Sequence, residues 1–250
     1  MNSMTSESEY QSRVKEVLFN DEFKDLLFKN GIPSYVKDQF RFERALSLVK
    51  YPRNKTIFEL GAFPGTGFYY FGEFNDMVGI GKTNLDFSKK TISLGHKLLD
   101  VDFESIKKGD ITVQADIVLA MEILEHIRMP YKFIETILDT IKPGGLLYLT
   151  TNNQSYIGYL VKLFFNKEIL DPIESENTFY PGHCRYYSLK ELVNVFNKFG
   201  FVVLESNYIN FLPKYKLYKS EKFGFIKNVF VKLFPNRFST HIEILIKKPE

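Results

Sequence analysis

The sequence has one cysteine, Cys184, no apolar run of membrane-spanning length and little excess of charge. A single cysteine excludes an intramolecular disulfide and is typical of a reducing compartment. The first residues are polar and acidic, without the basic start or the apolar stretch of a secretory signal. No apolar run approaches the roughly 20 residues that a membrane-spanning helix needs. We therefore expect a cytoplasmic protein, and 250 residues suit a substantial core.

The net charge of +3 is unevenly distributed along the chain. Residues 211–238 hold seven Lys or Arg and one acid, Glu221, which leaves 26 basic and 29 acidic side chains in the rest of the chain. Because the body of the chain is slightly acidic, a general nucleic-acid-binding surface is not expected. The partners that remain are small molecules, a membrane surface or a second protein chain.

The basic segment 211–238 is also rich in Phe and Tyr. Its apolar residues Phe225, Val229, Phe230, Leu233 and Phe234 suit one face of a helix. Basic amphipathic stretches of this kind lie on anionic membrane surfaces, which predicts peripheral contact with the inner face of a membrane. The alternative, which is commoner among such segments, is a lid or a homodimer patch whose lysines face water.

Apolar runs alternate with helical patterns along the rest of the chain. The pattern predicts an N-terminal helical extension, 1–52, whose helix spans 33–50, and a single domain over 53–250 with strands at 56–60, 77–81, 97–101, 116–121 and 146–151. A helix over 131–141 is predicted to end at Pro143-Gly144-Gly145. This alternation predicts a parallel sheet covered on both faces.

The C-terminal part has a different pattern. Ser188-Leu189-Lys190-Glu191 is a capping box that predicts the start of a helix, and Gly200 predicts its end. A sixth strand at 201–208 and a seventh at 242–247 follow without a well-patterned helix between them, which predicts an antiparallel last strand. The predicted fold is a Rossmann-like, doubly wound α/β domain with a seven-stranded, mostly parallel sheet.

The most informative segment is Glu59-Leu60-Gly61-Ala62-Phe63-Pro64-Gly65, at the end of the first predicted strand. A glycine-rich turn after a strand permits unusual backbone angles and close approach to a bound molecule. A plain strand-to-helix turn would have the same composition. A dinucleotide-binding turn would need Gly-x-Gly-x-x-Gly and an acid on the second strand, and the spacing of Gly61, Gly65 and Gly67 does not fit it.

Two further motifs follow in order. The strand 116–121 runs into Glu122-Ile123-Leu124-Glu125-His126, and Lys142-Pro143-Gly144-Gly145 precedes the fifth strand. Together with the glycine turn, these motifs resemble the class I S-adenosylmethionine-dependent methyltransferases over residues 54–208. If the chain turns helically after Met121, Glu122 and His126 are four residues apart and share a face.

The resemblance implies S-adenosylmethionine as the cofactor, S-adenosylhomocysteine as the product, and no metal. Backbone groups around Gly61 and Gly65 would contact the amino-acid end of the cofactor, and Glu59 would order the turn or meet the ammonium through water. Asp102 would accept a hydrogen bond from the adenine amine. The full set of implied cofactor-binding residues is Glu59, Gly61, Ala62, Phe63, Pro64, Gly65, Gly81, Asp102, Phe103, Met121 and Glu122.

One position departs from the family's pattern. The second strand of these enzymes usually ends in an acid that holds both ribose hydroxyls, and here Gly81 stands in its place. Losing a charge-assisted hydrogen-bond partner costs about 1.5–3 kcal/mol. Asn84 or Asp86 could substitute for it.

Thr150-Thr151-Asn152-Asn153 and the His183-x-Arg185 element before Tyr187-Ser188 resemble a subgroup associated with glycan synthesis, of methyltransferase type 11 or 23. This implies direct in-line O-methylation of a sugar or polysaccharide intermediate. Positioning of the reactants can supply ~7–11 kcal/mol, and a nearby base helps a hydroxyl lose its proton. His126 is the predicted general base, with Glu122 on the same face, and His183 and Arg185 are predicted to orient the acceptor.

Other interpretations of these residues stay open. His126 could only cap a helix, and Arg185 could only pair with a carboxylate such as Glu122. The same donor site would also serve N-methylation of an amino sugar or another small metabolite. A third alternative is a catalytically degenerate partner subunit that holds another protein through residues 211–238.

Overall fold

The computed structural model describes Ser8, Tyr10 and Ser12 and then residues 35–62, 65–82, 97–170, 182–210 and 229–250. Seven strands form one sheet in the order β3-β2-β1-β4-β5-β7-β6. The chain divides into two compact units, Met1–Asp100 and Val101–Glu250. The predicted extension, 1–52, and the first three predicted strands thus fall almost entirely within the first unit.

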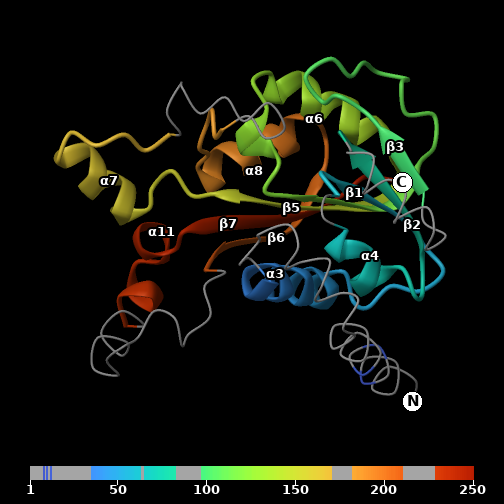
Figure 1. Ribbon diagram of the computed structural model, residues 1–250, viewed down its shortest axis with the longest axis horizontal. Coiled ribbons are helices and arrows are strands. Elements are labelled where there is room, and N and C mark those ends of the chain that lie inside the picture. Colours follow the sequence, from blue (N-terminus) through green and yellow to red (C-terminus); the bar gives the residue numbers. More distant parts are fainter. Residues whose placement is uncertain are drawn as a thin grey trace. The chain divides into compact units, whose positions relative to one another are not determined.

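The described residues of the first unit form two helices and three strands, which are labelled in Figure 1. They are α3 (Tyr35–Leu48), β1 (Thr56–Leu60), α4 (Thr66–Phe71), β2 (Asp76–Gly81) and β3 (Lys97–Asp100). β2 pairs in parallel with both β1 and β3. Ile57 and Phe58 of β1 are fully buried, and the rings of Phe42 and Tyr70 stack between α3 and α4 with their centroids 5.2 Å apart. Apolar packing around β1 therefore fixes the turn that follows it.

The second unit begins with β4 (Ala115–Met121), the 3₁₀ turn η1 (Leu124–His126), α6 (Pro130–Asp139) and β5 (Ile141–Asn152). It continues with α7 (Ile157–Phe164), α8 (Leu189–Lys198), β6 (Val202–Ile209), α11 (Pro235–Phe238) and β7 (His241–Lys247). β4 and β5 are parallel, whereas β7 is antiparallel to both β5 and β6. The predicted reversal of the last strand is confirmed.

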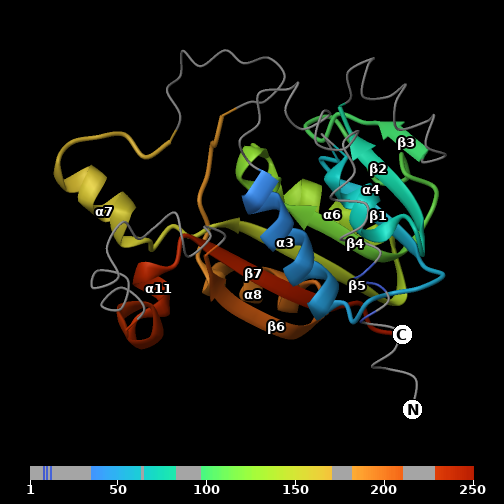
Figure 2. The same ribbon diagram turned by 60° about the horizontal axis from the view of Figure 1, so that its bottom comes forward.

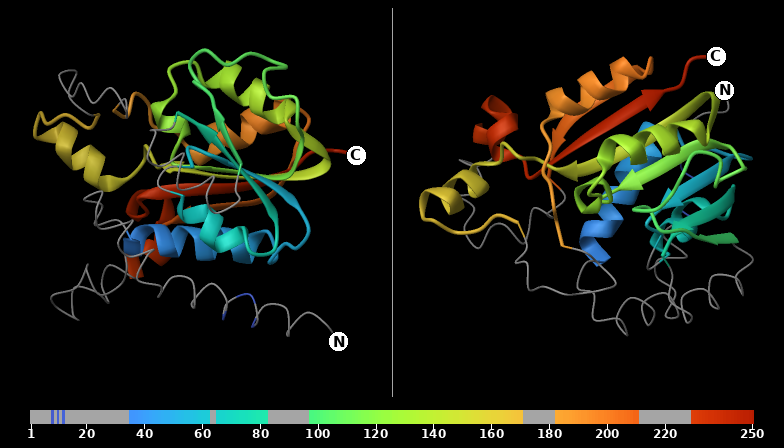
Figure 3. Two further views of the ribbon diagram at one scale, coloured as in Figure 1. Left: turned by 45° about the vertical axis from the view of Figure 1, so that its right-hand side comes forward. Right: turned by 90° about the horizontal axis from the view of Figure 1, so that it is seen from above.

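Within this unit α6 and α8 lie on the same side of the strands (Figures 1 and 3). α8 begins as predicted, because Ser188 Oγ accepts a hydrogen bond from the Glu191 amide at 3.1 Å. Phe196 and Leu192 of its inner stripe are buried. Gly200 follows the helix with a φ of 80°, as expected of a glycine that ends a helix.

One predicted boundary is wrong. Pro143-Gly144-Gly145 does not end α6, because that helix stops at Asp139 and β5 already begins at Ile141. Ile141 pairs with Ala115, and the Gly144 amide donates to the Lys248 carbonyl at 3.1 Å. The segment therefore extends the strand, with Gly144 in a left-handed conformation at φ 73°. Its backbone hydrogen bonds come from pairing across the sheet, which local turn signals cannot show.

Candidate functional site

In the first unit the glycine turn follows directly from β1. Gly61 and Gly65 have φ values of 69° and 94°, a left-handed region in which residues with a Cβ are strained. The Gly61 amide donates to the Ile80 carbonyl at 2.8 Å, and the Gly65 amide donates to the Ala62 carbonyl at 2.6 Å. The turn is thus held both to itself and to β2. Phe63 and Pro64, also predicted to bind the cofactor, lie outside the described residues.

Glu59 is buried beneath this turn, with only 5% of its surface exposed. A Cβ atom added to Gly67 would lie 2.2 Å from Glu59 Oε2. The carboxylate therefore occupies the space that any larger residue at position 67 would need. Gly67 was part of the predicted turn, and its role here is to admit the Glu59 side chain.

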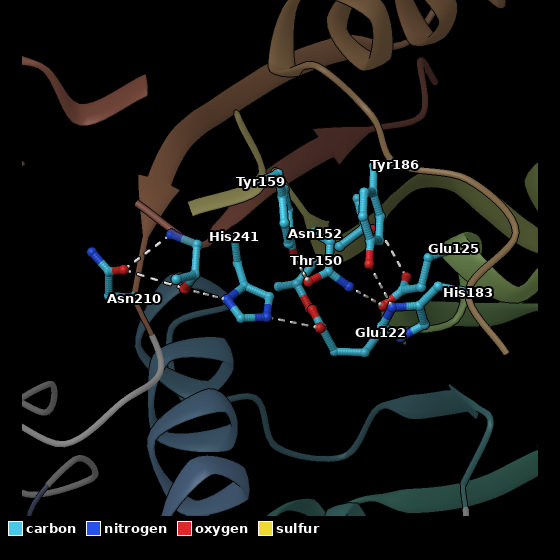
Figure 4. Close-up of polar contacts among 11 residues, drawn as sticks. Glu122, Glu125, Thr150, Asn152, Tyr159, His183, Tyr186, Asn210 and His241 are labelled. Atoms are coloured by element: carbon cyan, nitrogen blue, oxygen red, sulfur yellow. Dashed lines mark hydrogen bonds and ion pairs between the residues drawn. The ribbon is translucent and has the colours of Figure 1, made fainter. Parts of the chain in front are cut away.

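In the second unit Glu122 lies at the end of β4 with a left-handed backbone, φ 55°. Its amide donates to the Thr150 carbonyl at 3.0 Å, and the Thr150 hydroxyl donates to Glu122 Oε1 at 3.0 Å. His241 Nε2 lies 3.1 Å from Glu122 Oε2 (Figure 4). Both Glu122 and His241 are largely buried.

The predicted helical face shared by Glu122 and His126 is not formed. The left-handed backbone at Glu122 breaks the helical path, and only residues Leu124–His126 form a 3₁₀ turn. The carboxylate of Glu122 contacts Thr150 and His241, whereas His126 packs against His183. The two side chains therefore belong to different contact groups.

His241 is held from its other side by the start of β7 and the end of β6. Its Nδ1 lies 2.7 Å from the Thr240 hydroxyl, which donates to Asn210 Oδ1 at 3.2 Å. The Thr240 hydroxyl thus joins His241 to Asn210. A continuous set of contacts thus runs from Asn210 through His241 to Glu122 (Figure 4).

A second group surrounds Glu125, which has no exposed surface. Its carboxylate accepts hydrogen bonds from the Thr151 hydroxyl at 2.7 Å and from Asn152 Nδ2 at 3.2 Å. The rings of His126 and His183 meet edge to face beside it, with centroids 4.8 Å apart. One ligand atom from each of Glu125, His126 and His183 lies within 4.8 Å of the others, which is a spacing that a metal ion could use.

Tyrosines position the ring of His183. The Tyr186 hydroxyl donates to the Ile169 carbonyl at 2.8 Å and lies 3.2 Å from His183 Nδ1. The Tyr186 hydroxyl thus fixes the orientation of the His183 ring through Nδ1. Tyr159 stacks on Tyr186 at 4.7 Å (Figure 4), and burial raises the pKa of the Tyr159 hydroxyl above its ordinary value.

The segment that carries His183 is attached to η1 through its backbone. The Cys184 amide donates to the Glu125 carbonyl at 2.9 Å. Arg185 forms an ion pair with Glu191 at the start of α8, and its guanidinium lies over the Tyr187 ring at 5.2 Å. The carboxylate that Arg185 pairs with is therefore Glu191 rather than Glu122, and the arginine is half exposed.

The remaining predicted cofactor residues lie at strand ends. Gly81 is the last residue of β2, and Met121, which is buried, is the last of β4. Asp102 Oδ1 accepts a hydrogen bond from the Glu104 amide at 3.0 Å, so this carboxylate shapes its own turn. Phe103 packs edge to face on Phe133 with centroids 5.3 Å apart.

Several site residues were not predicted. Asn210 and His241 have no motif that marks them, and their partners lie far away in the sequence or on another strand. Tyr186 lies within the predicted element, and its partner His183 is three residues away. Thr150 and Asn152 lie within a motif that the sequence does show, and their position at the end of a predicted strand could have marked them. Asn153, in the same motif, is fully buried and donates to the Asn236 and Ser239 carbonyls at 2.9 and 2.8 Å.

Comparison with known proteins defines the class. The model of the methyltransferase domain family matches residues 22–206. The chain is 26% identical over 175 residues to a ubiquinone biosynthesis O-methyltransferase of Hydrogenovibrio crunogenus, covering 66% of this chain and 70% of that protein.

Solved structures share the fold. A SAM-dependent methyltransferase from Archaeoglobus fulgidus superposes with a TM-score of 0.57 at 15% identity, over 92% of this chain and all of that chain. Coclaurine N-methyltransferase, solved with N-methylheliamine and S-adenosylhomocysteine, gives a TM-score of 0.55 at 12% identity, over 83% and 72%.

These matches, together with the sheet order and the glycine turn, define a class I methyltransferase fold. The chain belongs to the methyltransferase domain family, and it is an S-adenosylmethionine-dependent enzyme. Both the predicted fold class and the resemblance are confirmed.

The residues of the first unit fit this cofactor. Gly61 and Gly65 have no Cβ and adopt left-handed backbone angles, and the Glu59 carboxylate occupies the space beside Gly67. Such a turn lets its backbone approach a ligand closely, and a buried acid suits an ammonium. When bound, S-adenosylmethionine supplies a methyl group on a sulfonium, which is already activated for displacement.

Proposed function

We propose that this methyltransferase transfers the methyl group to an oxygen atom of its acceptor, with His126 as the general base. The observation that carries this proposal is the His126–His183 pair beside the buried carboxylate of Glu125. A hydroxyl has to lose a proton as it attacks, and imidazole accepts protons near neutral pH. The relative named as an O-methyltransferase supports transfer to oxygen.

Each member of the group has a separate task in this proposal. His183, whose Nδ1 lies beside the Tyr186 hydroxyl, would contact the acceptor and orient it. His126 would accept the single proton of the attacking hydroxyl. The negative charge of Glu125 would stabilise the imidazolium that results. Arg185, which is half exposed on the same segment, would help to orient the acceptor.

For the acceptor we propose a hydroxyl of a sugar or glycan intermediate, on the resemblance of residues 150–153 and 183–188 to the glycan-associated subgroup. The relative's name favours a second candidate, an intermediate of ubiquinone biosynthesis. An amino sugar methylated on nitrogen is the third. The three classes differ in the group that receives the methyl, so the product identifies the class.

A tritiated-methyl screen over nucleotide sugars, lipid-linked glycans, amino sugars and phenols tests the acceptor. With the substrate found, His126→Gln should lower turnover about 10²- to 10⁴-fold. Calorimetry should show unchanged binding of S-adenosylhomocysteine by this variant. Near-normal turnover of His126→Gln would remove the base assignment, and a product methylated on nitrogen would remove O-transfer.

We further propose that an anionic membrane surface is a partner. The surface involved, here called the α7–α11 surface, consists of exposed apolar residues in two segments: 160–165, at the end of α7, and 229–234, which directly precedes α11. They are Leu160, Val161, Leu163, Phe164, Phe165, Val229, Phe230, Leu233 and Phe234. α7 has no buried residue, and Phe164 and Phe165 are 84% and 66% exposed. α7 and α11 lie at the same end of the second unit (Figures 1 and 2).

Charge favours a lipid surface over a second copy of the chain. Lys162, Lys167, Lys232 and Arg237 flank these apolar side chains, against one acid, Glu168. Two copies meeting through this surface would bring the same cations together, whereas anionic headgroups would neutralise them. Among the described residues, no helix is long and apolar enough to cross a bilayer. The rest of the basic segment, 211–228, lies outside the described residues.

Co-sedimentation with vesicles tests this partner. The protein should bind phosphatidylglycerol vesicles, bind phosphatidylcholine vesicles weakly, and dissociate as salt rises. Phe164→Ser with Phe165→Ser should reduce binding severalfold, whereas Leu204→Ser, at an exposed apolar position on β6, should not. Equal binding by the double variant, or a stable dimer in solution that the double variant disrupts, would overturn the membrane proposal. Binding would be consistent with a location at the inner face of the membrane.

A further inference from the structure

The end of β2 leaves a gap where a carboxylate is expected. Gly81 has a φ of 145°, so a residue with a Cβ would be strained at this position. The ribose of S-adenosylmethionine carries two adjacent hydroxyls, and two oxygens of one carboxylate can accept hydrogen bonds from both. Another residue therefore has to supply that carboxylate if the ribose is held in the same way.

The neighbouring strand places an acid opposite the gap. β2 and β3 are parallel, and in their register Gly79 lies opposite Leu98 and Gly81 lies opposite Asp100. Side chains two residues apart on a strand point to the same face. Asp100, the last residue of β3, is thus on the same face of the sheet as Leu98, and it is exposed.

Leu98 shows that a β3 side chain reaches the space beside a β2 glycine. A Cβ atom added to Gly79 would lie 2.7 Å from Leu98 Cδ2. Leu98 therefore leans across the strand into the position that a larger residue would fill. In the same register Asp100 lies opposite Gly81, two residues further along both strands.

This face is also the one that adjoins the cofactor turn. The same Cβ at Gly79 would lie 2.8 Å from the Cβ of Ala62, and the Gly61 amide donates to the Ile80 carbonyl at 2.8 Å. The glycine turn after β1, Gly81 at the end of β2 and Asp100 at the end of β3 thus lie at the ends of neighbouring strands in the first unit.

From this geometry we propose that Asp100 holds the ribose hydroxyls of S-adenosylmethionine, in place of the acid absent at Gly81. Asp100 acts across the sheet from β3, and glycine at position 81 leaves the room that its side chain needs. The proposal depends on the cofactor, which the family defines, and not on the acceptor or on His126. A failure to find the acceptor would leave it untouched.

Titration calorimetry with S-adenosylhomocysteine tests the proposal without any turnover. Asp100→Asn should weaken binding about 10- to 100-fold, because one charge-assisted acceptor is lost. Asp100→Glu, which keeps the carboxylate, should recover most of that loss. Asp76→Asn is the matched control, since Asp76 is an exposed acid at the opposite end of β2 and its partner is Lys97. It should bind within about twofold of the parent chain.

The decisive comparison uses an analogue of S-adenosylhomocysteine that lacks both ribose hydroxyls. It should bind the parent chain more weakly than S-adenosylhomocysteine does, and Asp100→Asn should weaken it no further. Two results would overturn the proposal: unchanged binding of S-adenosylhomocysteine by Asp100→Asn, or an equal loss for both ligands. A melting temperature of Asp100→Asn close to that of the parent chain completes the comparison.

Discussion

At the scale of single residues, three glutamates near strand ends differ in their surroundings. Glu59 fills the cradle at Gly67, Glu122 links two strands through Thr150 and His241, and Glu125 is buried beside two histidines. The same residue type therefore packs a turn, joins strands and provides a fixed negative charge. Each environment gives a different expected result on substitution.

The close contact between Gly67 and the Glu59 carboxylate predicts that a larger residue at position 67 weakens cofactor binding. Gly67→Ala would force a Cβ to within 2.2 Å of Glu59 Oε2, so the buried carboxylate has to move. We expect a cost of about 1–3 kcal/mol in the free energy of unfolding, measured in urea, and weaker binding of S-adenosylhomocysteine in calorimetry. Ser206→Ala, at an exposed position on β6 in the second unit, is the control and should leave both values nearly unchanged. Unchanged cofactor binding by Gly67→Ala would show that the turn does not need this packing.

The contacts of Glu122 predict coupling between Thr150 and His241. Each of these side chains engages one oxygen of the same largely buried carboxylate. Removing one partner of a charged group costs about 1.5–3 kcal/mol. The unfolding free energies of Thr150→Val, His241→Leu and the double variant should depart from additivity by more than about 0.5 kcal/mol. Additive values would mean that the two contacts do not act on one carboxylate.

Part of the candidate site could be proposed from the sequence, and its roles stay predictions. The glycine turn, Glu122 and His126 follow from motifs at strand ends, because parallel strands bring their carboxyl ends to one edge of a sheet. His241 and Asn210 could not be predicted in the same way. Their contacts depend on β7 running antiparallel beside β5, which aligns His241 with Asn152. Only the register of the folded sheet contains that information.

At the scale of whole elements, start and stop signals were reliable where the helix satisfies its own backbone groups. The capping box at Ser188 and the glycine after α8 mark that helix correctly. Pro143-Gly144-Gly145 misled because its hydrogen bonds are made to the C-terminal residues rather than within the segment. Local signals therefore fail where pairing with a distant strand decides the conformation.

The cap of α8 gives a prediction about stability. Ser188→Ala removes the acceptor of the Glu191 amide and should lower the free energy of unfolding by about 1 kcal/mol. Urea denaturation at constant pH measures it. Ser206→Ala on β6, at an exposed position, should change the value by less than about 0.5 kcal/mol. An unchanged free energy of unfolding for Ser188→Ala would show that water accepts the hydrogen bond from the Glu191 amide equally well.

At the scale of the whole molecule, the cofactor should stabilise the native chain. A ligand that binds only the folded state at 100 times its Kd adds about 2.7 kcal/mol. For a chain of this size we expect a rise in Tm of roughly 5–10 °C with S-adenosylhomocysteine, increasing with its concentration. Differential scanning calorimetry measures the shift, and adenosine alone serves as the comparison. A Tm that does not depend on S-adenosylhomocysteine would contradict specific binding to the folded chain.

The end of β5 has a consequence for how this enzyme can diversify. Four consecutive residues, 150–153, contact several parts of the second unit: Glu122, Glu125, the hydroxyl of Tyr159 and the Asn236 and Ser239 carbonyls. A deletion of one residue there would exchange every one of these attachments at once. During evolution, new acceptor preferences should therefore arise by substitution of exposed side chains such as those of α7. Residues 150–153 should stay constant among closely related enzymes.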